Sequence, residues 1–187
     1  MKLIKLVTAI TLATAISATA FAGGMKNSNP MVGGAAMYAT KDIVDNAVNS
    51  KDHTTLVAAL KAAGLVDTLK GPGPFTVFAP TNAAFAKLPA GTVDTLLKPE
   101  NKATLTAVLT YHVVAGKFDA KNLAKQVKNG RGKATLTTVQ GGKLTVTSVG
   151  KGLVVTDAKG GSAKVTIGNV YQSNGVIHVV DSVLLPK

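Results

Sequence analysis

Three histidines are the side chains of this chain best suited to acid–base or metal chemistry, namely His53, His112 and His178. Histidine titrates near neutral pH, so it can move a proton or bind a metal. Asp181 and Ser182 follow His178 closely, which invites a hydrolase-triad interpretation. Successive residues of a strand point to opposite faces, however, so closeness along the chain does not bring these groups together.

The residues around each histidine predict a structural role instead. His112 and His178 lie in apolar, β-rich runs, "YHVVAG" and "VIHVVD". These runs predict strands in which each histidine is half-buried, stays neutral and donates one ring N–H to a main-chain carbonyl. His53 stands at the start of a predicted helix and is expected to be exposed. The spacing of the three histidines does not match that of metal ligands.

The stretch "GPGPFTVFAPTNAAFAKLP", residues 71–89, changes from strand to helix with polar residues at the bend. Enzymes often carry a nucleophile at such a turn. Here the polar residues have structural explanations. Thr76 lies on a strand predicted to be covered on both faces, and Pro80 keeps the chain extended after it. Thr81 suits the N-cap of the following helix, and Asn82 falls in its first turn.

Composition excludes several enzyme classes. The chain has no cysteine, which excludes disulfides, thiolate zinc sites and a cysteine nucleophile. No G-x-S-x-G elbow occurs, and no glycine–lysine pair is followed by the Ser or Thr of a phosphate-binding loop. Glu100 is the single glutamate, and the aspartates are scattered, so a glycosidase pair is not indicated. We therefore expect no catalytic residue, no metal site and no cofactor.

Positive charge is the strongest feature of the composition. The formal net charge is +12, and residues 117–164 hold ten basic residues against Asp119 and Asp157. Such a field favours anionic partners such as acidic polysaccharide, lipid headgroups or nucleic acid. A solubilising surface explains the same charge. Only 4% of the residues are aromatic, whereas single-strand binding needs aromatics among the basic residues, so specific nucleic-acid binding is not expected.

The candidate partner-binding residues lie in and after a predicted amphipathic helix, residues 120–128. Asp119 is its expected N-cap, and Leu123 and Val127 are expected to face inward. Three lysines fall on one side of this helix and two basic residues follow it: Lys121, Lys125, Lys128, Arg131 and Lys133. Arg131 is the only arginine, and it alone offers a planar, two-pronged donor for an anion.

The chain divides into three parts. Residues 1–22 combine two lysines, a short apolar run and "AFA" at 20–22, which predicts a signal peptide for Sec-type export. Residues 23–40 are rich in glycine and polar residues and are expected to form an extended arm, in which Met31–Val32 and Met37–Tyr38 are segments able to dock on the domain. Residues 41–187 have the size of a single domain with one core.

Helices precede strands in the predicted domain. Apolar residues recur at helical spacing behind Asp42 and again over residues 52–71, where Gly64 is a natural stop. Thr92 is the expected cap of a later helix. From about Ala134 the apolar period becomes two, with glycine turns between successive strands. A run of helices followed by a run of strands predicts an α+β fold rather than a doubly wound parallel sheet.

Three segments, in order, resemble the signature boxes of fasciclin domains. "FTVFAPTNAAFAKLP" resembles the first box, "NGVIHVVDSVLLP" the second, and "LTYHVVAGKF" the tyrosine–histidine segment between them. The resemblance covers residues 40–186. It implies an α+β fold of N-terminal helices packed beside a β-wedge of two small, mainly antiparallel sheets. The sequence departs from the family pattern at Asn82, where Asp is common, and at His53, where an aromatic is common.

The resemblance also carries roles for single residues. The tyrosine–histidine segment is implicated in adhesion in animal relatives, which implies a partner-binding role for Tyr111 and His112. Thr76, Thr81 and Asn82 match the polar residues of the first box. His178 matches the histidine of the second box.

Two functions are compatible with these features. Fasciclin domains are secreted or surface domains without typical catalytic activity, which implies a periplasmic or extracellular adhesion module. Its expected partner is an anionic glycan, matrix or cell-surface component, with membranes touched only peripherally if at all. The alternative is a carrier of a small apolar ligand, or an envelope stress protein, with a cleft between helices and wedge. The sequence leaves both open.

Overall fold

The computed structural model describes residues 29–187 of the chain. The signal peptide expected over residues 1–22 and the first part of the expected arm, residues 23–28, lie outside the described residues. Within the described part, no helix combines the length and the apolar character needed to cross a membrane.

Residues 29–40 form a folded cover rather than the expected extended arm. β1 (Met31–Val32) and β2 (Ala35–Ala36) pair as a short antiparallel hairpin, and Val32 and Met37 are buried in the core. Two glycines with positive φ form the turn between the strands. Because this turn is tight, the apolar residues on both sides of it can reach the domain together, and a composition-based prediction of an extended arm misses that.

The helices follow the sequence prediction closely. Their bounds are α1 Ile43–Ala47, η1 Lys51–His53, α2 Thr54–Ala63, α3 Val66–Lys70, α4 Asn82–Ala86, α5 Thr92–Leu97, η2 Pro99–Asn101, α6 Lys102–Tyr111 and α7 Ala120–Asn129. The side chains of Asp42 and Asp119 accept main-chain hydrogen bonds at the starts of α1 and α7, which confirms both predicted N-caps. Gly64 ends α2 in the left-handed conformation, as predicted.

Two helix ends differ from the prediction. α5 begins after Gly91, whose φ is 80°, so Thr92 is the first helical residue and not the cap. Tyr111 ends α6 and His112 follows it in helical conformation, so strand β4 begins only at Val113. The prediction of a strand from Tyr111 was wrong because β-branched content cannot locate the change from helix to strand within one residue.

A seven-stranded sheet runs through the molecule in the order β4-β3-β9-β8-β7-β6-β5. The strand bounds are β3 Phe75–Pro80, β4 Val113–Ala115, β5 Lys133–Thr137, β6 Lys143–Val149, β7 Gly152–Thr156, β8 Ser162–Gln172 and β9 Gly175–Val180. Neighbours are antiparallel except β3 and β9, which run parallel.

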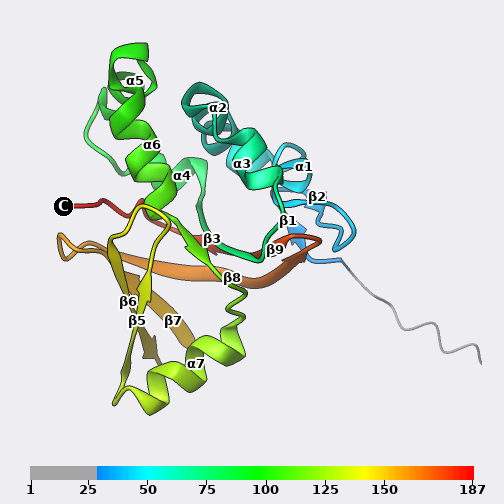
Figure 1. Cartoon of the computed structure of the whole chain (residues 1–187), viewed down its shortest axis with the longest axis vertical. Coiled ribbons are helices and arrows are strands. Elements are labelled where there is room, and N and C mark those ends of the chain that lie inside the picture. The colour runs from blue at the N-terminus through cyan, green and yellow to red at the C-terminus, as the bar shows by residue number, and fades with distance from the viewer. Residues whose placement is uncertain (1–28) are drawn as a thin grey trace, which may run out of the picture.

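The strands form one hydrogen-bonded sheet and not the two small sheets that were predicted, because the long strand β8 belongs to both groups of strands. β8 pairs with β7 and also with β9, through two register shifts, and so joins both groups of strands in one hydrogen-bonded order. At the outer strands, β4 and β5 meet through a bridge between Val114 and Thr138, so the sheet curls back on itself. Figure 1 shows α1–α6 at one end of this sheet and α7 at the other end, against β5 and β6.

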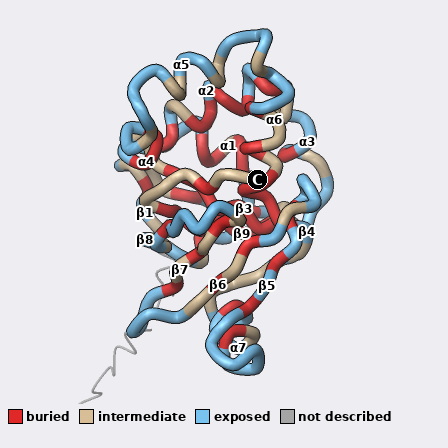
Figure 2. The backbone as a smooth tube through the Cα atoms, turned by 90° about the vertical axis from the view of Figure 1, so that its left-hand side faces the viewer, coloured by how far each residue is buried: buried red, intermediate tan, exposed pale blue. Residues whose placement is uncertain are grey.

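Two apolar cores, rather than the single one expected, lie on the two faces of β3. Val77 and Ala79 belong to the core beneath α1–α6, and Phe78 belongs to the core that α7 closes. Alternate residues of a strand point to opposite faces, so the prediction that this strand is covered on both faces is confirmed. Figure 2 shows buried backbone along the central strands and exposed backbone along much of α5 and α7.

Candidate functional site

The polar residues at the strand-to-helix bend tie neighbouring elements together. The Thr81 hydroxyl accepts a hydrogen bond from the N–H of Ala84 at 3.2 Å, which confirms the predicted N-cap of α4. Thr76 donates its hydroxyl proton to the carbonyl of Gly116 at 2.6 Å and accepts from the N–H of Phe118 at 2.9 Å. Pro80 remains within β3, beside β9. The bend therefore has main-chain partners for its hydroxyl groups.

Asn82 holds the start of α2 as well as lying in the first turn of α4. Its side-chain oxygen accepts from the N–H of Thr55 at 3.0 Å. Its amide nitrogen donates to the carbonyl of Lys51 at 2.8 Å and to the hydroxyl of Thr54 at 3.0 Å. An aspartate at this position would lack the two N–H donors, so the amide is matched to its partners.

His112 is buried, and both of its ring nitrogens are engaged. Nδ1 donates to the carbonyl of Val108 at 2.8 Å, and Nε2 accepts from the N–H of Leu184 at 2.9 Å. This pair of partners selects the neutral ring with its proton on Nδ1. Burial lowers the pKa of His112 to about 4, from an ordinary value of 6.5. The expected neutral histidine bonded to a carbonyl is confirmed, although it is fully rather than half buried.

Asp157 holds the same C-terminal segment, a role that its local sequence does not predict. Its carboxylate accepts from the N–H groups of Lys159 at 2.9 Å and Gly161 at 2.7 Å, and from Leu185 at 2.9 Å. An aspartate before a glycine pair signals a turn, so the first two contacts follow a familiar pattern. The contact to Leu185 joins residues far apart in sequence, and no local pattern reports it.

Tyr111 is fully buried next to His112. Its hydroxyl donates to the carbonyl of Lys143 at 2.7 Å and accepts from the N–H of Ala158 at 2.9 Å. A Cβ on Gly142 would lie 2.5 Å from the Tyr111 ring, so this glycine leaves room for it. The folded domain presents neither Tyr111 nor His112 on its surface, so direct contact of a partner with these two side chains does not fit the structure.

His178 lies inside the domain and does not form a triad with Asp181 and Ser182. Its Nε2 donates to the carbonyl of Phe118 at 2.8 Å, and its ring stacks on Phe78 with centroids 5.7 Å apart. Burial lowers its pKa. Asp181 instead accepts from the N–H of Lys164 at 2.8 Å and from the Ser182 hydroxyl at 3.1 Å. The hydroxyl and carboxylate are thus neighbours, but the imidazole faces elsewhere.

His53 is 3% exposed, so the expectation of an exposed side chain was wrong. Its Nδ1 lies 2.8 Å from the hydroxyl of Ser50. The hairpin of residues 31–36 covers this region, where the N–H of Lys51 donates to the carbonyl of Gly33 at 3.2 Å. A position at a helix start does not reveal such a cover. Burial lowers the pKa of His53. Among the described residues, no three His, Cys, Asp or Glu side chains come close enough together to hold a metal ion.

The exposed candidates lie on α7 and the segment that follows it, and we call this set the basic face. It consists of Lys121, Lys125, Lys128, Arg131 and Lys133, all exposed. Leu123 and Val127 anchor α7 by packing into the core above β5 and β6, as the sequence predicted. Because the apolar residues point inward at helical spacing, the lysines are held outward on a rigid element.

The basic face has no carboxylate partner within residues 29–187. The ion pairs found within residues 29–187 all involve other lysines: Lys70 pairs with Asp42 and Asp45, Lys87 with Asp181, and Lys98 with Glu100. Asp119, the nearest acid in sequence, is engaged as the N-cap of α7. The five cations therefore face solvent without internal neutralisation.

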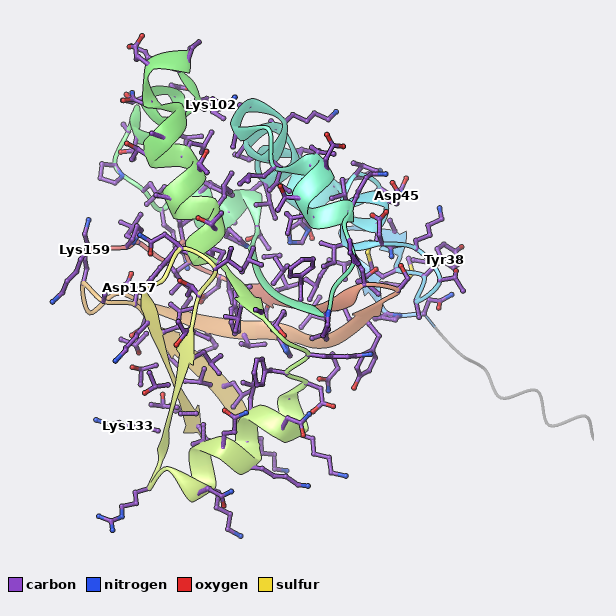
Figure 3. The ribbon with its side chains drawn as sticks, in the orientation of Figure 1. Tyr38, Asp45, Lys102, Lys133, Asp157 and Lys159 are labelled. Atoms are coloured by element: carbon purple, nitrogen blue, oxygen red, sulfur yellow. The ribbon has the colours of Figure 1, made fainter. Side chains whose placement is uncertain are left out.

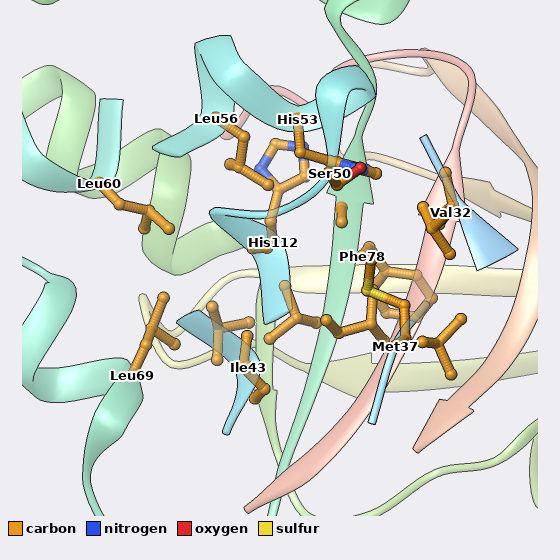
Figure 4. Close-up of a pocket in the computed structure, with 17 residues that line it drawn as sticks. Val32, Met37, Ile43, Ser50, His53, Leu56, Leu60, Leu69, Phe78 and His112 are labelled. Atoms are coloured by element: carbon orange, nitrogen blue, oxygen red, sulfur yellow. The ribbon is translucent and has the colours of Figure 1, made fainter. Parts of the chain in front are cut away.

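An apolar cavity of about 30 Å³ lies between the hairpin, α1, α2 and β3. Figure 4 shows Val32 and Met37 from the N-terminal cover and Leu56 from α2 around it, with His53 and His112 at its edge. This volume has room for about one or two water molecules. A larger ligand would require the hairpin to move. His53 contributes a buried Nε2 atom without a hydrogen-bond partner beside this cavity.

Comparison with known proteins identifies the class to which this fold belongs. The fasciclin domain profile matches residues 51–186, and the chain belongs to the fasciclin domain family. The solved FAS1 domain pair from the insect cell adhesion molecule Fasciclin I superposes with a TM-score of 0.69 at 20% identity. That match covers 78% of this chain and 51% of the insect chain, and it supports the fold alone.

Two bacterial relatives are more similar in sequence. Protein sll1483 of Synechocystis sp. is 46% identical over 157 residues, covering 83% of this chain and 79% of the relative. The cell surface glycolipoprotein MPB83 of Mycobacterium bovis is 39% identical over 159 residues. This second match covers 82% of the present chain and 64% of MPB83.

Proposed function

We propose that this protein is a non-catalytic binding module of the periplasm or the extracellular surface, exported by a Sec-type signal, that attaches to an anionic glycan, matrix or cell-surface component. The observation that carries the proposal is the basic face, a set of five exposed cations without an ion pair among the described residues. Family membership and the surface location named for MPB83 support it.

The basic face suits an extended anionic partner. Each exposed cation contributes only about 1 kcal/mol at contact distance in water, so a single pair would bind weakly. Several cations along one helix and the following strand can meet successive charges of a polymer together. Attraction of this kind is screened by salt, with a Debye length of about 10 Å at 0.1 M. Membranes enter this proposal only as peripheral anionic surfaces.

Arg131 gives the basic face its one shape-selective group. It lies in the turn between α7 and β5 with a φ of 56°, a left-handed conformation that side chains rarely adopt. This conformation closes the C-terminus of α7, because the N–H of Gly132 donates to the carbonyl of Val127 at 2.8 Å. Its guanidinium can bind a carboxylate or sulfate with two parallel hydrogen bonds.

Retention of the purified mature protein on the host's cell envelope tests the proposal. We expect binding at low salt, progressive release towards about 1 M salt, and loss of binding when the five basic-face residues are changed to Gln. Binding that is equal at low and high salt would remove the electrostatic mechanism. Binding that survives the five substitutions would show that the basic face serves only to keep the protein soluble.

The second candidate is a small-ligand carrier or envelope stress protein. Such a ligand would occupy the apolar cavity beneath the hairpin, beside the unpartnered Nε2 of His53, and the hairpin would have to move outward to admit it, because the cavity measures only about 30 Å³. Native mass spectrometry of protein purified from its host distinguishes the two functions. A bound small molecule that is lost from a Val32→Ile variant, whose added methyl group occupies part of the cavity, while the unfolding midpoint is unchanged, would favour the carrier. Empty protein would count against it.

A further inference from the structure

A surface cleft separate from the basic face combines two exposed aromatic rings with polar groups. The cleft has a volume of about 500 Å³ and is lined by Pro30, Tyr38 and Tyr171, with Asn29 and Thr40 among the polar residues. The two tyrosines are 45% and 40% exposed. The volume lies in the range of ordinary ligand sites, about 300–1,000 Å³. In Figure 3, Tyr38 lies well apart from Lys133 of the basic face.

A buried amide network holds both tyrosine-bearing segments in place. Asn46 is fully buried. Its Oδ1 accepts from the N–H of Tyr38 at 3.0 Å, and its Nδ2 donates to the Tyr38 carbonyl at 2.7 Å. The same Nδ2 donates to the side chain of Gln172, the residue next to Tyr171. One side chain thus links the two segments that carry the tyrosines, which lowers the ordering that a ligand has to impose on them.

A second link crosses the same gap, because the N–H of Ser173 donates to the carbonyl of Lys41 at 2.9 Å. The N–H of Met37 donates to the carbonyl of Pro30 at 2.9 Å, which fixes the hairpin side of the cleft. Met37 is itself 2% exposed and forms part of the floor. The segments that carry the two exposed rings are therefore tied to each other and to the hairpin by main-chain hydrogen bonds.

Two ammonium groups flank the rings. The Nζ of Lys41 lies 5.4 Å from the centroid of Tyr38, and the Nζ of Lys117 lies 5.1 Å from the centroid of Tyr171. An exposed contact of this kind contributes about 0.5–1 kcal/mol, so a ligand can displace the ammonium from the ring at small cost. The nearby acids Asp42 and Asp45 are both paired with Lys70. Within residues 29–187 neither flanking lysine forms an ion pair.

We infer that this cleft binds an acidic saccharide, a sugar that contains uronic acid units. The apolar C–H face of a sugar ring stacks on Tyr38 and Tyr171, as amphipathic rings favour. Sugar hydroxyl groups meet the amide of Asn29 and the hydroxyl of Thr40, and the carboxylate meets Lys41 or Lys117. A lipid chain would need a closed apolar lining, which this open cleft lacks. The inference does not depend on the basic face or on its proposed function.

The chain offers a direct spectroscopic test because it has three tyrosines. In protein with isotope-labelled tyrosine rings, digalacturonic acid is expected to shift the NMR signals of Tyr38 and Tyr171. Tyr111 is buried and does not line the cleft, so its NMR signal serves as the internal control for the fold. Galactobiose, the neutral counterpart, is expected to bind more weakly. Unmoved Tyr38 and Tyr171 signals, or equal binding of both sugars, would overturn the inference.

Variants assign the contacts and separate this site from the basic face. Tyr38→Ala and Tyr171→Ala are each expected to weaken digalacturonate binding about tenfold through lost stacking, whereas the Phe variants retain it. Lys117→Gln is expected to reduce the preference for the acidic sugar. The variant with a neutralised basic face is expected to keep the tyrosine shifts. Shifts that vanish in that variant, or that an acidic peptide reproduces with tighter binding, would contradict a saccharide site here.

Discussion

The tyrosine–histidine segment and the basic face use their polar groups in opposite ways. Tyr111 and His112 are buried, and their polar atoms bond to main-chain groups of distant segments. The cations of the basic face are exposed and lack carboxylate partners among residues 29–187. The contrast teaches that the signature residues of the family hold the fold together here. The cations of the basic face, by contrast, are exposed and free of internal ion pairs among residues 29–187.

Replacement of Tyr111 should have the largest effect on stability. Tyr111→Ala removes a fully buried ring and leaves a cavity, so we expect a loss of about 3–5 kcal/mol in the free energy of unfolding, measured by urea titration. Tyr111→Phe keeps the ring but leaves the carbonyl of Lys143 and the N–H of Ala158 without their partner, which should cost about 1–3 kcal/mol. A loss for Tyr111→Ala as small as that of an exposed-lysine variant would contradict the contrast.

The buried histidines should make stability depend on pH, with His112 contributing most. Its pKa is about 4 in the folded protein and about 6.5 when unfolded, so the unfolded chain binds the proton more readily. Stability is therefore fully present above about pH 6.5 and is lost as the pH falls towards 4, by about 3 kcal/mol in all. The lowered pKa values of His53 and His178 act in the same direction.

Urea titrations at several pH values between 4.5 and 7 would measure this slope. That range avoids the protonation of Asp45 and Asp181, whose pKa values are lowered in the folded protein. A His112→Gln variant is expected to be less stable at pH 7 and to show a shallower dependence on pH. If the variant kept the full slope, the titration would have to be assigned to other groups.

Substitution of Asn82 should have an intermediate effect. Asn82→Asp removes the N–H donor to the carbonyl of Lys51 and places a carboxylate oxygen beside that carbonyl, whereas the Thr54 hydroxyl can still donate to the carboxylate, so we expect a loss of about 1–3 kcal/mol in unfolding free energy. Asn122→Asp is a matched control in the first turn of α7, where an exposed carboxylate is neutral or slightly stabilising. Equal effects of the two changes would show that the Asn82 amide contacts contribute nothing.

Removal of the α4 cap should have the smallest of these effects. Thr81→Ala deletes the bond to the N–H of Ala84 and should cost about 1 kcal/mol. Thr92→Ala, at a first helical residue without a capping bond, should cost much less. Thermal or urea unfolding compares the two variants. An unchanged unfolding midpoint for Thr81→Ala would show that the Thr81 cap does not stabilise the domain.

Local patterns predicted most elements, because caps, periodicity and glycine turns act over a few residues. The caps at Asp42, Thr81 and Asp119 and the strand of Phe75–Pro80 followed from such patterns. The hairpin over residues 31–36 did not, because its stability comes from Val32 and Met37 packing into a core formed by later segments. A polar, glycine-rich composition carries no information about that packing.

The hydrogen-bond partners that lie far away in sequence could not be predicted for the polar residues. His53 was predicted to be exposed because the sequence indicates its place at a helix start but not the hairpin that covers it. The role of Asp157 was not predicted, because its bond to Leu185 depends on the whole fold. The bracing of Tyr38 and Tyr171 through Asn46 likewise joins segments more than a hundred residues apart in sequence. By contrast, the outward direction of Lys121, Lys125 and Lys128 followed directly from helical spacing.

The central claim is that binding depends on where the positive charge lies and not only on its amount. Two variants of equal net charge test it most directly. One carries Gln at all five positions of the basic face. The other carries Gln at five exposed lysines elsewhere: Lys51, Lys61, Lys98, Lys102 and Lys159.

Retention of both variants on the host's cell envelope at the same salt concentration is the measurement. We predict that the basic-face variant loses most of its retention, that the other keeps most of it, and that neither changes the unfolding midpoint appreciably. Equal loss in the two variants would contradict the account, because net charge alone would then explain binding.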